Sequence, residues 1–255
     1  MRHANVSFFM GSMGPLKFQE KIYQTKKKML LSSFLIAISI QTAASTTCDL
    51  LAKAGNPCVA AHSTVRALFA DFSGPLYSVR RESDGTSLDV KVQSKGGFAD
   101  SASQDRFCSN TSCVFDRIYD QTVFQNHLGI APAGGAHWKP DIPASADSDP
   151  LHVGGHKVYG LRMDPPSGYR NDTTTGIAVG DEAETIYAVM NGTHYNNKCC
   201  FDYGNAETNN LDDGAATMEA LYFGNAKDNG LNHGGAGKGP WIMADMENAL
   251  WGTSM

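Results

Sequence analysis

The sequence predicts a mainly β protein built as an antiparallel β-sandwich, of the jelly-roll or concanavalin-like type, with few short helices. Apolar and polar residues alternate with a period of two in several short segments, and Gly, Asn, Asp or Pro bounds these segments. No alternation of strand, helix and strand is evident, which argues against a parallel α/β sheet. We therefore expect one sandwich domain over residues 45–255, preceded by a leader at residues 1–44.

The expected elements follow in chain order. Residues 63–72 (STVRALFADF) predict one helix, because apolar side chains recur there at helical spacing. These apolar residues are Val65, Leu68, Phe69 and Phe72. Strands are expected within residues 88–94, 185–192, 218–225 and 239–250. Residues 137–150 are polar and rich in proline, and we expect an extended loop there.

Residues 1–44 are interpreted as a leader that ends in a secretory signal peptide. Three lysines, Lys26–Lys28, precede an apolar run at residues 29–40, and small residues follow. The run of about twelve residues is shorter than the roughly 20 that span a bilayer. We expect cleavage after Ala44 or Ser45, secretion to the extracellular space and no membrane attachment afterwards.

The mature part is acidic. Six of the 21 basic residues and one of the 26 acidic residues lie in residues 1–44, so 15 basic and 25 acidic residues remain, a net charge of −10. Such a chain repels polyphosphates, so nucleic acid is a poor partner. Neutral polymers or small molecules are better candidates, and we expect a monomer.

All six cysteines lie in the mature part, which agrees with export. Six cysteines allow 15 pairings, but three local couples stand out. They are Cys48 with Cys58, Cys108 with Cys113, and Cys199 with Cys200. The first two couples would close short loops. A disulfide across such a loop stabilises the fold by less than the roughly 3 kcal/mol expected for a 15-residue loop. Bridges there are expected to fix local shape.

The adjacent pair Cys199 and Cys200 admits three interpretations. A vicinal disulfide would strain the backbone, and strained backbone is often found at ligand sites. Its flat sulfur face could pack on a sugar ring. The same ring could form a rigid turn without any ligand. Metal binding would need further ligands such as His152 and His156 of HVGGH, but the two glycines between them suit a turn better. We prefer the ligand-facing vicinal disulfide.

Three sequons predict N-glycosylation, at Asn110, Asn171 and Asn191. An attached glycan requires an exposed asparagine. Asn110 lies in the short loop between Cys108 and Cys113, so its exposure is the best supported of the three.

The segment GPWIMADMENAL, residues 239–250, predicts a strand with two different faces. Alternation places Ile242, Ala244 and Met246 on the face that suits the core. The opposite face then carries Trp241, Met243, Asp245 and Glu247. Its two carboxylates point the same way, with α-carbons about 6.6 Å apart. With Asn248 next in the chain they indicate a sugar-binding wall, although a solvated strand face would also carry acidic residues.

A glycosidase could use one of these two carboxylates as its nucleophile. A retaining enzyme needs its nucleophile and its general acid on opposite sides of the scissile bond. Two neighbours on one strand approach from the same side. The general acid is therefore expected on another segment.

Four segments together resemble the catalytic domain of the fungal α-L-arabinofuranosidase B enzymes, glycoside hydrolase family 54. They are PCVAAHSTVRALFADFSGPLY (57–77), FCSNTSCVFDRIYDQ (107–121), GTHYNNKCCFDYGNAET (192–208) and GPWIMADMEN (239–248). The resemblance implies a secreted retaining exo-hydrolase that releases terminal L-arabinofuranose from arabinoxylan and arabinan of plant cell walls. It implies no metal and no organic cofactor.

The resemblance also implies a role for each residue that matches a family motif. Glu247 matches the nucleophile. The residues that match substrate-binding positions are Asp245, Asn248, Cys199 and Cys200, the two cysteines as a vicinal disulfide that lines the pocket. The other four cysteines match two local bridges, and Asn110 matches a glycosylated asparagine.

Several departures from the family pattern bear on activity. The family's general acid/base is an Asp in a glycine-rich segment after the nucleophile, and no such segment lies between Glu247 and Met255. The sandwich is therefore expected to be C-terminally incomplete and, alone, inactive or weakly active. Asn232 stands where counting places a pocket tryptophan, and Ala249 replaces a sugar-binding asparagine. The family's β-trefoil module is also missing from the sequence. Alternatives are a non-catalytic carbohydrate-binding domain and a secreted sandwich that binds a metal or an unrelated small molecule.

Overall fold

The computed structural model describes residues 46–134, 138–179, 182–197, 202–205, 219–225 and 239–246. Strands and irregular segments dominate this part of the chain, and each of its two helices has 7 residues. Every pair of named strands is antiparallel, so the predicted antiparallel β class is confirmed. The elements are α1 (Thr47–Lys53), β1 (Pro75–Arg81), β2 (Ser87–Lys91), α2 (Ser101–Phe107), β3 (Cys113–Ile118), β4 (Leu128–Ile130), β5 (Pro150–Val153), β6 (His156–Tyr159), β7 (Tyr169–Arg170), β8 (Asp202–Gly204), β9 (Glu219–Gly224) and β10 (Trp241–Met246).

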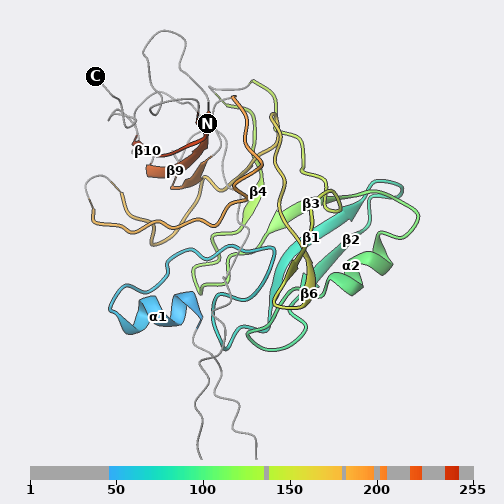
Figure 1. Ribbon diagram of the computed structural model, residues 1–255, viewed down its shortest axis with the longest axis horizontal. Coiled ribbons are helices and arrows are strands. Elements are labelled where there is room, and N and C mark those ends of the chain that lie inside the picture. The colour runs from blue at the N-terminus through green and yellow to red at the C-terminus, as the bar shows by residue number, and fades with distance from the viewer. Residues whose placement is uncertain are drawn as a thin grey trace, which may run out of the picture.

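The largest sheet has five strands in the order β2-β1-β3-β4-β7, and α2 lies alongside β1 and β2 (Figure 1). Val79 of β1 sits in register with Leu88 of β2 on one side and Phe115 of β3 on the other. The alternation predicted around β2 is confirmed, because Val90 is buried while Asp89 and Lys91 are exposed. This sheet supplies eight of the 21 buried residues of the apolar core cluster, more than either of the other described sheets.

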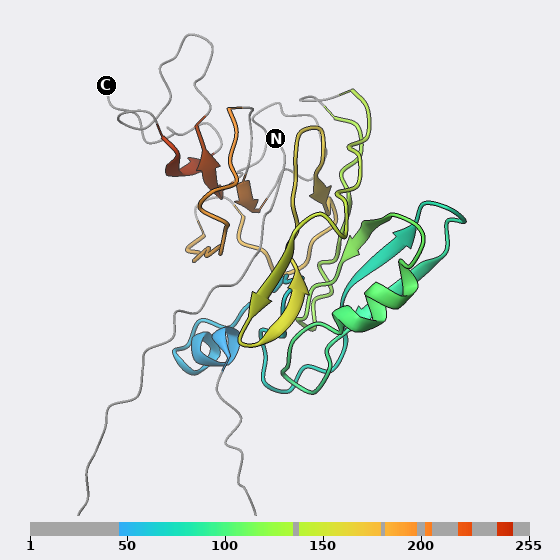
Figure 2. The same cartoon turned by 45° about the vertical axis from the view of Figure 1, so that its right-hand side comes forward.

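A second sheet of three strands, β10-β9-β8, lies at the opposite end of the molecule from α2 (Figures 1 and 2). Its long pair, β9 and β10, confirms the strands expected within 218–225 and 239–250. The strands β5 and β6 form a separate hairpin. Gly154 and Gly155 make its turn with positive φ angles of 58° and 84°, so the interpretation of HVGGH as a turn is confirmed.

The helix predicted over residues 63–72 is wrong. Two of its central N–H groups bond to distant parts of the chain: the Ala67 N–H donates to the Gly97 carbonyl and the Leu68 N–H to Gln121 Oε1. The apolar side chains Val65 and Leu68 are buried as expected. The segment therefore has apolar residues at helical spacing but an irregular backbone, whose polar groups find hydrogen-bond partners on neighbouring elements.

The strand predicted over residues 185–192 is also not observed. A strand needs a neighbouring strand to pair its N–H and C=O groups, and no described strand pairs with this segment. Tyr187 and Val189 nevertheless pack against the core. The apolar pattern thus indicated burial correctly and secondary structure incorrectly.

The expected orientation of the strand at β10 is wrong at its first two residues. Trp241 is 7% exposed and belongs to the core, whereas Ile242 is 79% exposed. The indole carries more apolar surface than the isoleucine side chain, so its burial removes more apolar area from water. Burial of the largest ring therefore decided which face points inward.

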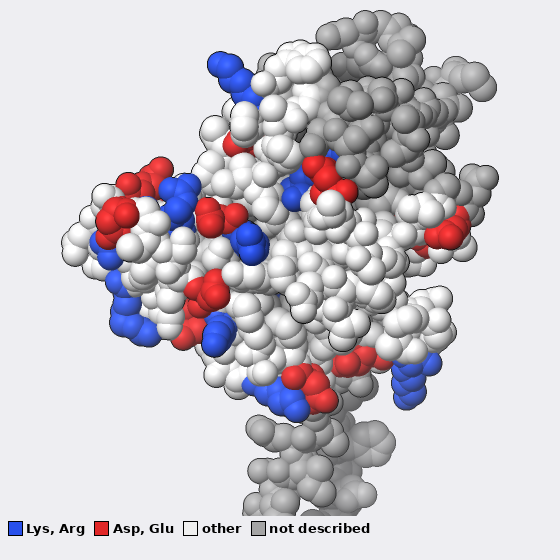
Figure 3. Space-filling view, turned by 180° about the vertical axis from the view of Figure 1, so that it is seen from behind, with Lys and Arg blue, Asp and Glu red and all other residues white. Residues whose placement is uncertain are grey.

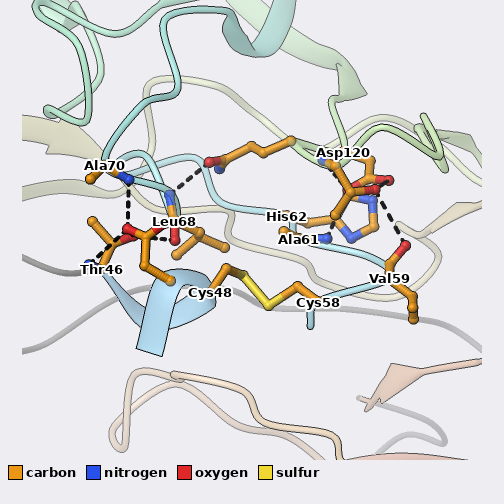
Figure 4. The surroundings of a disulfide bond; sticks show 12 residues. Thr46, Cys48, Cys58, Val59, Ala61, His62, Leu68, Ala70 and Asp120 are labelled. Carbon is orange, nitrogen blue, oxygen red and sulfur yellow. Dashed lines mark hydrogen bonds between the residues drawn. A yellow bond between two sulfur atoms is a disulfide. The ribbon is translucent and has the colours of Figure 1, made fainter. Parts of the chain in front are cut away.

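The N-terminal helix α1 is held by its cap and by a disulfide (Figure 4). Thr46 and Asp49 form a capping box, and Asp49 Oδ2 also accepts the Ala70 N–H at 2.8 Å. Cys48 is bonded to Cys58, with α-carbons 5.5 Å apart. The predicted pairing of these two cysteines is confirmed, as is that of Cys108 with Cys113.

The face of the molecule seen in Figure 3 shows no single dominant charge. On the face seen in Figure 3, acidic and basic side chains lie next to each other and surround a broad uncharged area. Ion pairs such as Lys157 with Asp105 at 2.8 Å account for part of this mixing. Neither helix in the described part of the chain is long and apolar enough to cross a membrane.

Candidate functional site

The structure places one of the predicted site residues. Asp245 lies in β10, in register with Ala220 of β9. The others lie outside the described residues: Glu247, Asn248, Cys199, Cys200, Asn232 and Ala249. Two of them adjoin the small sheet in the chain, because Glu247 follows the last residue of β10 and one residue separates Cys200 from β8. The β8–β10 sheet is therefore the described part of the predicted site.

A cavity of about 510 Å³ lies beside β8. Its lining comes from residues 55–62, from parts of 169–187, and from Tyr203 and Gly204 of β8 together with Asn205, which follows β8. Its apolar lining includes Leu68, Leu128, Tyr169, Ile177, Tyr187 and Tyr203. Its polar lining includes Asn126, Asn171, Glu182, Glu184 and Asn205.

The polar side chains that line this cavity are amides and carboxylates, several of which are bonded to neighbouring groups. Asn205 Nδ2 donates to Glu184 Oε1 at 3.5 Å, and Glu182 Oε2 accepts the Val179 N–H at 3.1 Å. The positive charge of Arg170 is balanced by Asp172, with 2.5 Å between Nε and Oδ1. Aromatic rings beside amide and carboxylate oxygens suit a neutral ligand with many hydroxyl groups better than a polyanion.

His62 links the cavity wall to β8. Its Nε2 lies 2.7 Å from the Asn126 carbonyl oxygen, and its Nδ1 lies 3.0 Å from the Tyr203 hydroxyl. A carbonyl oxygen can only accept, so Nε2 carries the proton and Nδ1 accepts from Tyr203. The two rings meet edge to face, with centroids 6.0 Å apart.

Asp120 is the hub behind His62 (Figure 4). Its Oδ1 accepts the Ala61 N–H at 2.8 Å and the Thr122 N–H at 3.0 Å. Its Oδ2 accepts the Asn126 N–H at 2.9 Å and the Thr122 hydroxyl at 2.5 Å. One buried carboxylate thus fixes the residue before His62 and the residue whose carbonyl His62 contacts.

Burial dominates the electrostatics of this network. It lowers the pKa of His62, which Asp120 and the Asn126 carbonyl raise in part. Burial also lowers the pKa of His127, whose Nδ1 accepts the Asp120 N–H. The pKa of Tyr203 is raised by burial, so its hydroxyl stays protonated and able to donate.

None of the three residues His62, Asp120 and Tyr203 was singled out from the sequence. Each lies inside a segment that carried the family resemblance, at 57–77, 107–121 and 192–208. Their location in these segments was the only sequence signal that could have pointed to these three residues. Their mutual contact spans more than 140 positions between His62 and Tyr203, so no local pattern could have paired them.

The fold and the cavity define a β-sandwich protein with an apolar pocket that also carries amide and carboxylate side chains. The family model described as "Alpha-L-arabinofuranosidase B, catalytic" matches residues 47–255. The chain therefore belongs to this family, glycoside hydrolase family 54.

Curated relatives agree with this assignment. The probable α-L-arabinofuranosidase B of Aspergillus flavus is 51% identical over 220 residues, which are 85% of this chain and 43% of the relative. The α-L-arabinofuranosidase B of Aspergillus oryzae is 50% identical over 220 residues, with the same coverage of 85% and 43%. The chain thus spans less than half the length of these relatives.

Solved structures of the family share the fold. A crystal structure of an arabinofuranosidase complexed with arabinofuranosyl-α-1,2-xylobiose matches with a TM-score of 0.75 and 51% identity, over 80% of this chain and 42% of that chain. A glutamate-to-glutamine mutant of a GH54 α-L-arabinofuranosidase, soaked with 4-nitrophenyl α-L-arabinofuranoside, matches with the same TM-score of 0.75, identity of 51% and coverage of 80% and 42%.

Proposed function

We propose that this chain is the catalytic-domain portion of a secreted, retaining, exo-acting α-L-arabinofuranosidase. The match of the family model over residues 47–255 carries the proposal. The proposed substrates are terminal L-arabinofuranose side chains on arabinoxylan and arabinan. The arabinofuranosyl-xylobiose bound to the related arabinofuranosidase supports a xylan-linked side chain.

In the proposed reaction Glu247 is the nucleophile. Its carboxylate forms a bond to the anomeric carbon while the glycosidic C–O bond breaks, and a general acid gives the leaving oxygen its proton. The same group, now a base, takes a proton from water, and that water releases arabinose from Glu247 with its configuration retained. Asp245 and Asn248 hydrogen-bond the sugar hydroxyls. A vicinal disulfide of Cys199 and Cys200 is the wall against which the furanose ring packs.

The pairing of β10 with β9 supports the placement of these groups. Six consecutive register pairs hold β10, so its C-terminal end is fixed against a neighbouring strand. A nucleophile that follows directly on such a strand is better positioned than one in a free loop.

Hydrolysis of 4-nitrophenyl α-L-arabinofuranoside tests the nucleophile. Glu247→Gln should reduce the release of nitrophenol to the background rate, because the amide cannot form the glycosyl ester. Glu82→Gln is the matched control, since Glu82 is exposed and lies beyond the end of β1 in the large sheet. A mechanism-based arabinofuranose probe should label the peptide that contains Glu247. Label on another carboxylate would refute the assignment.

We further propose that the general acid/base is an Asp in sequence that follows residue 255. The full gene product and residues 45–255 are to be assayed in parallel, and the proposal expects activity in the first and little or none in the second. The alternative is a non-catalytic carbohydrate-binding domain. It would be supported by arabinose affinity without hydrolysis in the full gene product.

Secretion and glycosylation are also proposed. The two disulfides support passage through an oxidising compartment. Asn110 and Asn191 are exposed, whereas Asn171 is half-buried and lines the cavity. Mass spectrometry of the secreted protein should find its N-terminus at residue 45 or 46 and hexosamine on these asparagines. An intact leader on extracellular protein, or unmodified sequons, would contradict the respective proposal.

A further inference from the structure

The small sheet β8–β10 must be held in a defined orientation if it carries a binding site. Tyr203 of β8 is in register with Leu221 of β9, and Leu221 is in register with Ala244 of β10. The three strands therefore move as one unit. Cys200 lies three positions before Tyr203 in the chain, and Glu247 lies one position after β10. A displacement of β8 would therefore also displace the two segments of the proposed site, the one before β8 and the one after β10.

Apolar packing attaches this sheet to the core but does not orient it by itself. Tyr222 of β9 and Trp241 of β10 are buried in the common core cluster. The hydrophobic contribution of such burial is non-directional, because it depends on the area removed from water. A hydrogen bond depends on both distance and angle and therefore specifies an orientation.

The bond between Tyr203 and His62 supplies a directional contact from within β8 itself, whereas Asn205, which bonds to the Ala178 carbonyl and to Glu184, follows the strand. His62 is 5% exposed, so water does not compete for its Nδ1. Its other nitrogen is occupied by the Asn126 carbonyl, which leaves Nδ1 able only to accept. The Tyr203 hydroxyl is 3.0 Å away and donates to it.

The imidazole is itself fixed from behind. Asp120 accepts the Ala61 N–H at 2.8 Å and the Asn126 N–H at 2.9 Å. These bonds hold the residue before His62 and the residue whose carbonyl sets the His62 tautomer. A continuous series of bonds thus runs from the large sheet, through Asp120, Asn126 and His62, to Tyr203 on the small sheet.

We propose that His62 is a positioning residue of the arabinofuranosidase site: by accepting the Tyr203 hydroxyl it fixes β8, and with it the segments that carry Cys199, Cys200 and Glu247. This inference rests on the proposed function. His62 touches no reacting atom in this role. Its effect is geometric, and a displacement of about 1 Å in a catalytic group can reduce the rate by roughly 100-fold.

Tyr203→Phe tests the inference in the full gene product. It removes one hydroxyl and keeps the ring, so the packing of β8 is retained. We expect kcat/KM on 4-nitrophenyl α-L-arabinofuranoside to fall by about tenfold or more, at temperatures where the variant remains folded by circular dichroism. Tyr159→Phe is the control, because it deletes the hydroxyl bond of a tyrosine in the β5–β6 hairpin, to Asp105 Oδ1 at 2.6 Å, away from the small sheet. Its kcat/KM should equal that of the wild type.

Two substitutions of His62 separate positioning from general stability. In His62→Asn the amide oxygen can take the place of Nδ1 and accept from Tyr203. In His62→Gln the amide reaches the position of Nε2, binds the Asn126 carbonyl and leaves Tyr203 without its acceptor. We expect the Asn variant to keep most of the wild-type kcat/KM and the Gln variant to match Tyr203→Phe. A purely structural role would order the variants by stability instead.

The outcomes distinguish this inference from the proposed function. If the wild-type gene product does not hydrolyse arabinofuranosides, the proposed function fails and the inference fails with it. If the wild type is active and Tyr203→Phe is as active as Tyr159→Phe, only the inference is overturned. A fall in kcat/KM for Tyr203→Phe and His62→Gln, without a fall for His62→Asn, supports it.

Discussion

Replacing Asp120 should destabilise the protein more than any comparable change of a surface carboxylate. Asp120 is buried and accepts three backbone N–H groups, those of Ala61, Thr122 and Asn126, as well as the Thr122 hydroxyl. Asp120→Ala leaves all three backbone donors without their acceptor. A buried donor that loses its partner costs about 1–3 kcal/mol.

The expected magnitude follows from these bonds. Three orphaned donors at about 1–3 kcal/mol each would cost about 3–9 kcal/mol, and part of this loss is offset because a charge is no longer buried, which leaves about 3–5 kcal/mol. A domain of this size loses about 2–4 °C in its unfolding midpoint per kcal/mol, so the midpoint should fall by about 6–20 °C. Asp120→Asn keeps one acceptor oxygen and should cost about half as much.

Thermal unfolding followed by circular dichroism measures this effect. Asp84→Ala is the control, since Asp84 is exposed and accepts the Thr86 N–H at 3.0 Å and the Thr86 hydroxyl at 2.7 Å. Water can replace that acceptor, so its cost should stay below about 0.5–1 kcal/mol. Equal shifts of the unfolding midpoint for Asp120→Ala and Asp84→Ala would refute the assignment of Asp120 as the hub.

Two further predictions concern pH and the disulfides. Burial lowers the pKa of both His62 and His127, with Asp120 opposing the shift at both. The unfolded chain therefore binds more protons below about pH 6.5, and the free energy of unfolding should fall as the pH drops from about 7.5 to about 5. In His62→Asn this pH dependence of the unfolding midpoint should be weaker; an unchanged slope would contradict the prediction. Replacing Cys108 and Cys113 by alanine opens a loop with a sequence separation of 5 and should cost about 2 kcal/mol, measured by denaturant unfolding. The separation of 10 between Cys48 and Cys58 should make that bridge worth about 2.7 kcal/mol. The reverse order would show that loop closure is not the main source of their stability.

Local patterns predicted the elements whose energetics are local. The alternation around Val90 predicted β2 correctly, and the spacing of Cys48 with Cys58 predicted their bridge. The two glycines at 154 and 155 predicted a turn, because only glycine adopts positive φ at both positions without strain.

Patterns failed where the backbone finds distant partners. Val65 and Leu68 recur at helical spacing, yet their segment bonds to residues 97 and 121 and is not a helix. Trp241 and Ile242 were assigned to the wrong faces of β10, because alternation defines two faces but not which one is buried. The core cluster that receives Trp241 is built from residues on other elements.

By itself the sequence determined the β-rich class, the two local disulfides and membership of the arabinofuranosidase family, since these follow from periodicity, short loops and contiguous motifs. Only the tertiary structure decided which side of β10 faces the core and that His62, Asp120 and Tyr203 form one network. Burial and hydrogen-bond partnership are properties of the packed chain, and the free energy of both depends on neighbours that are remote in sequence.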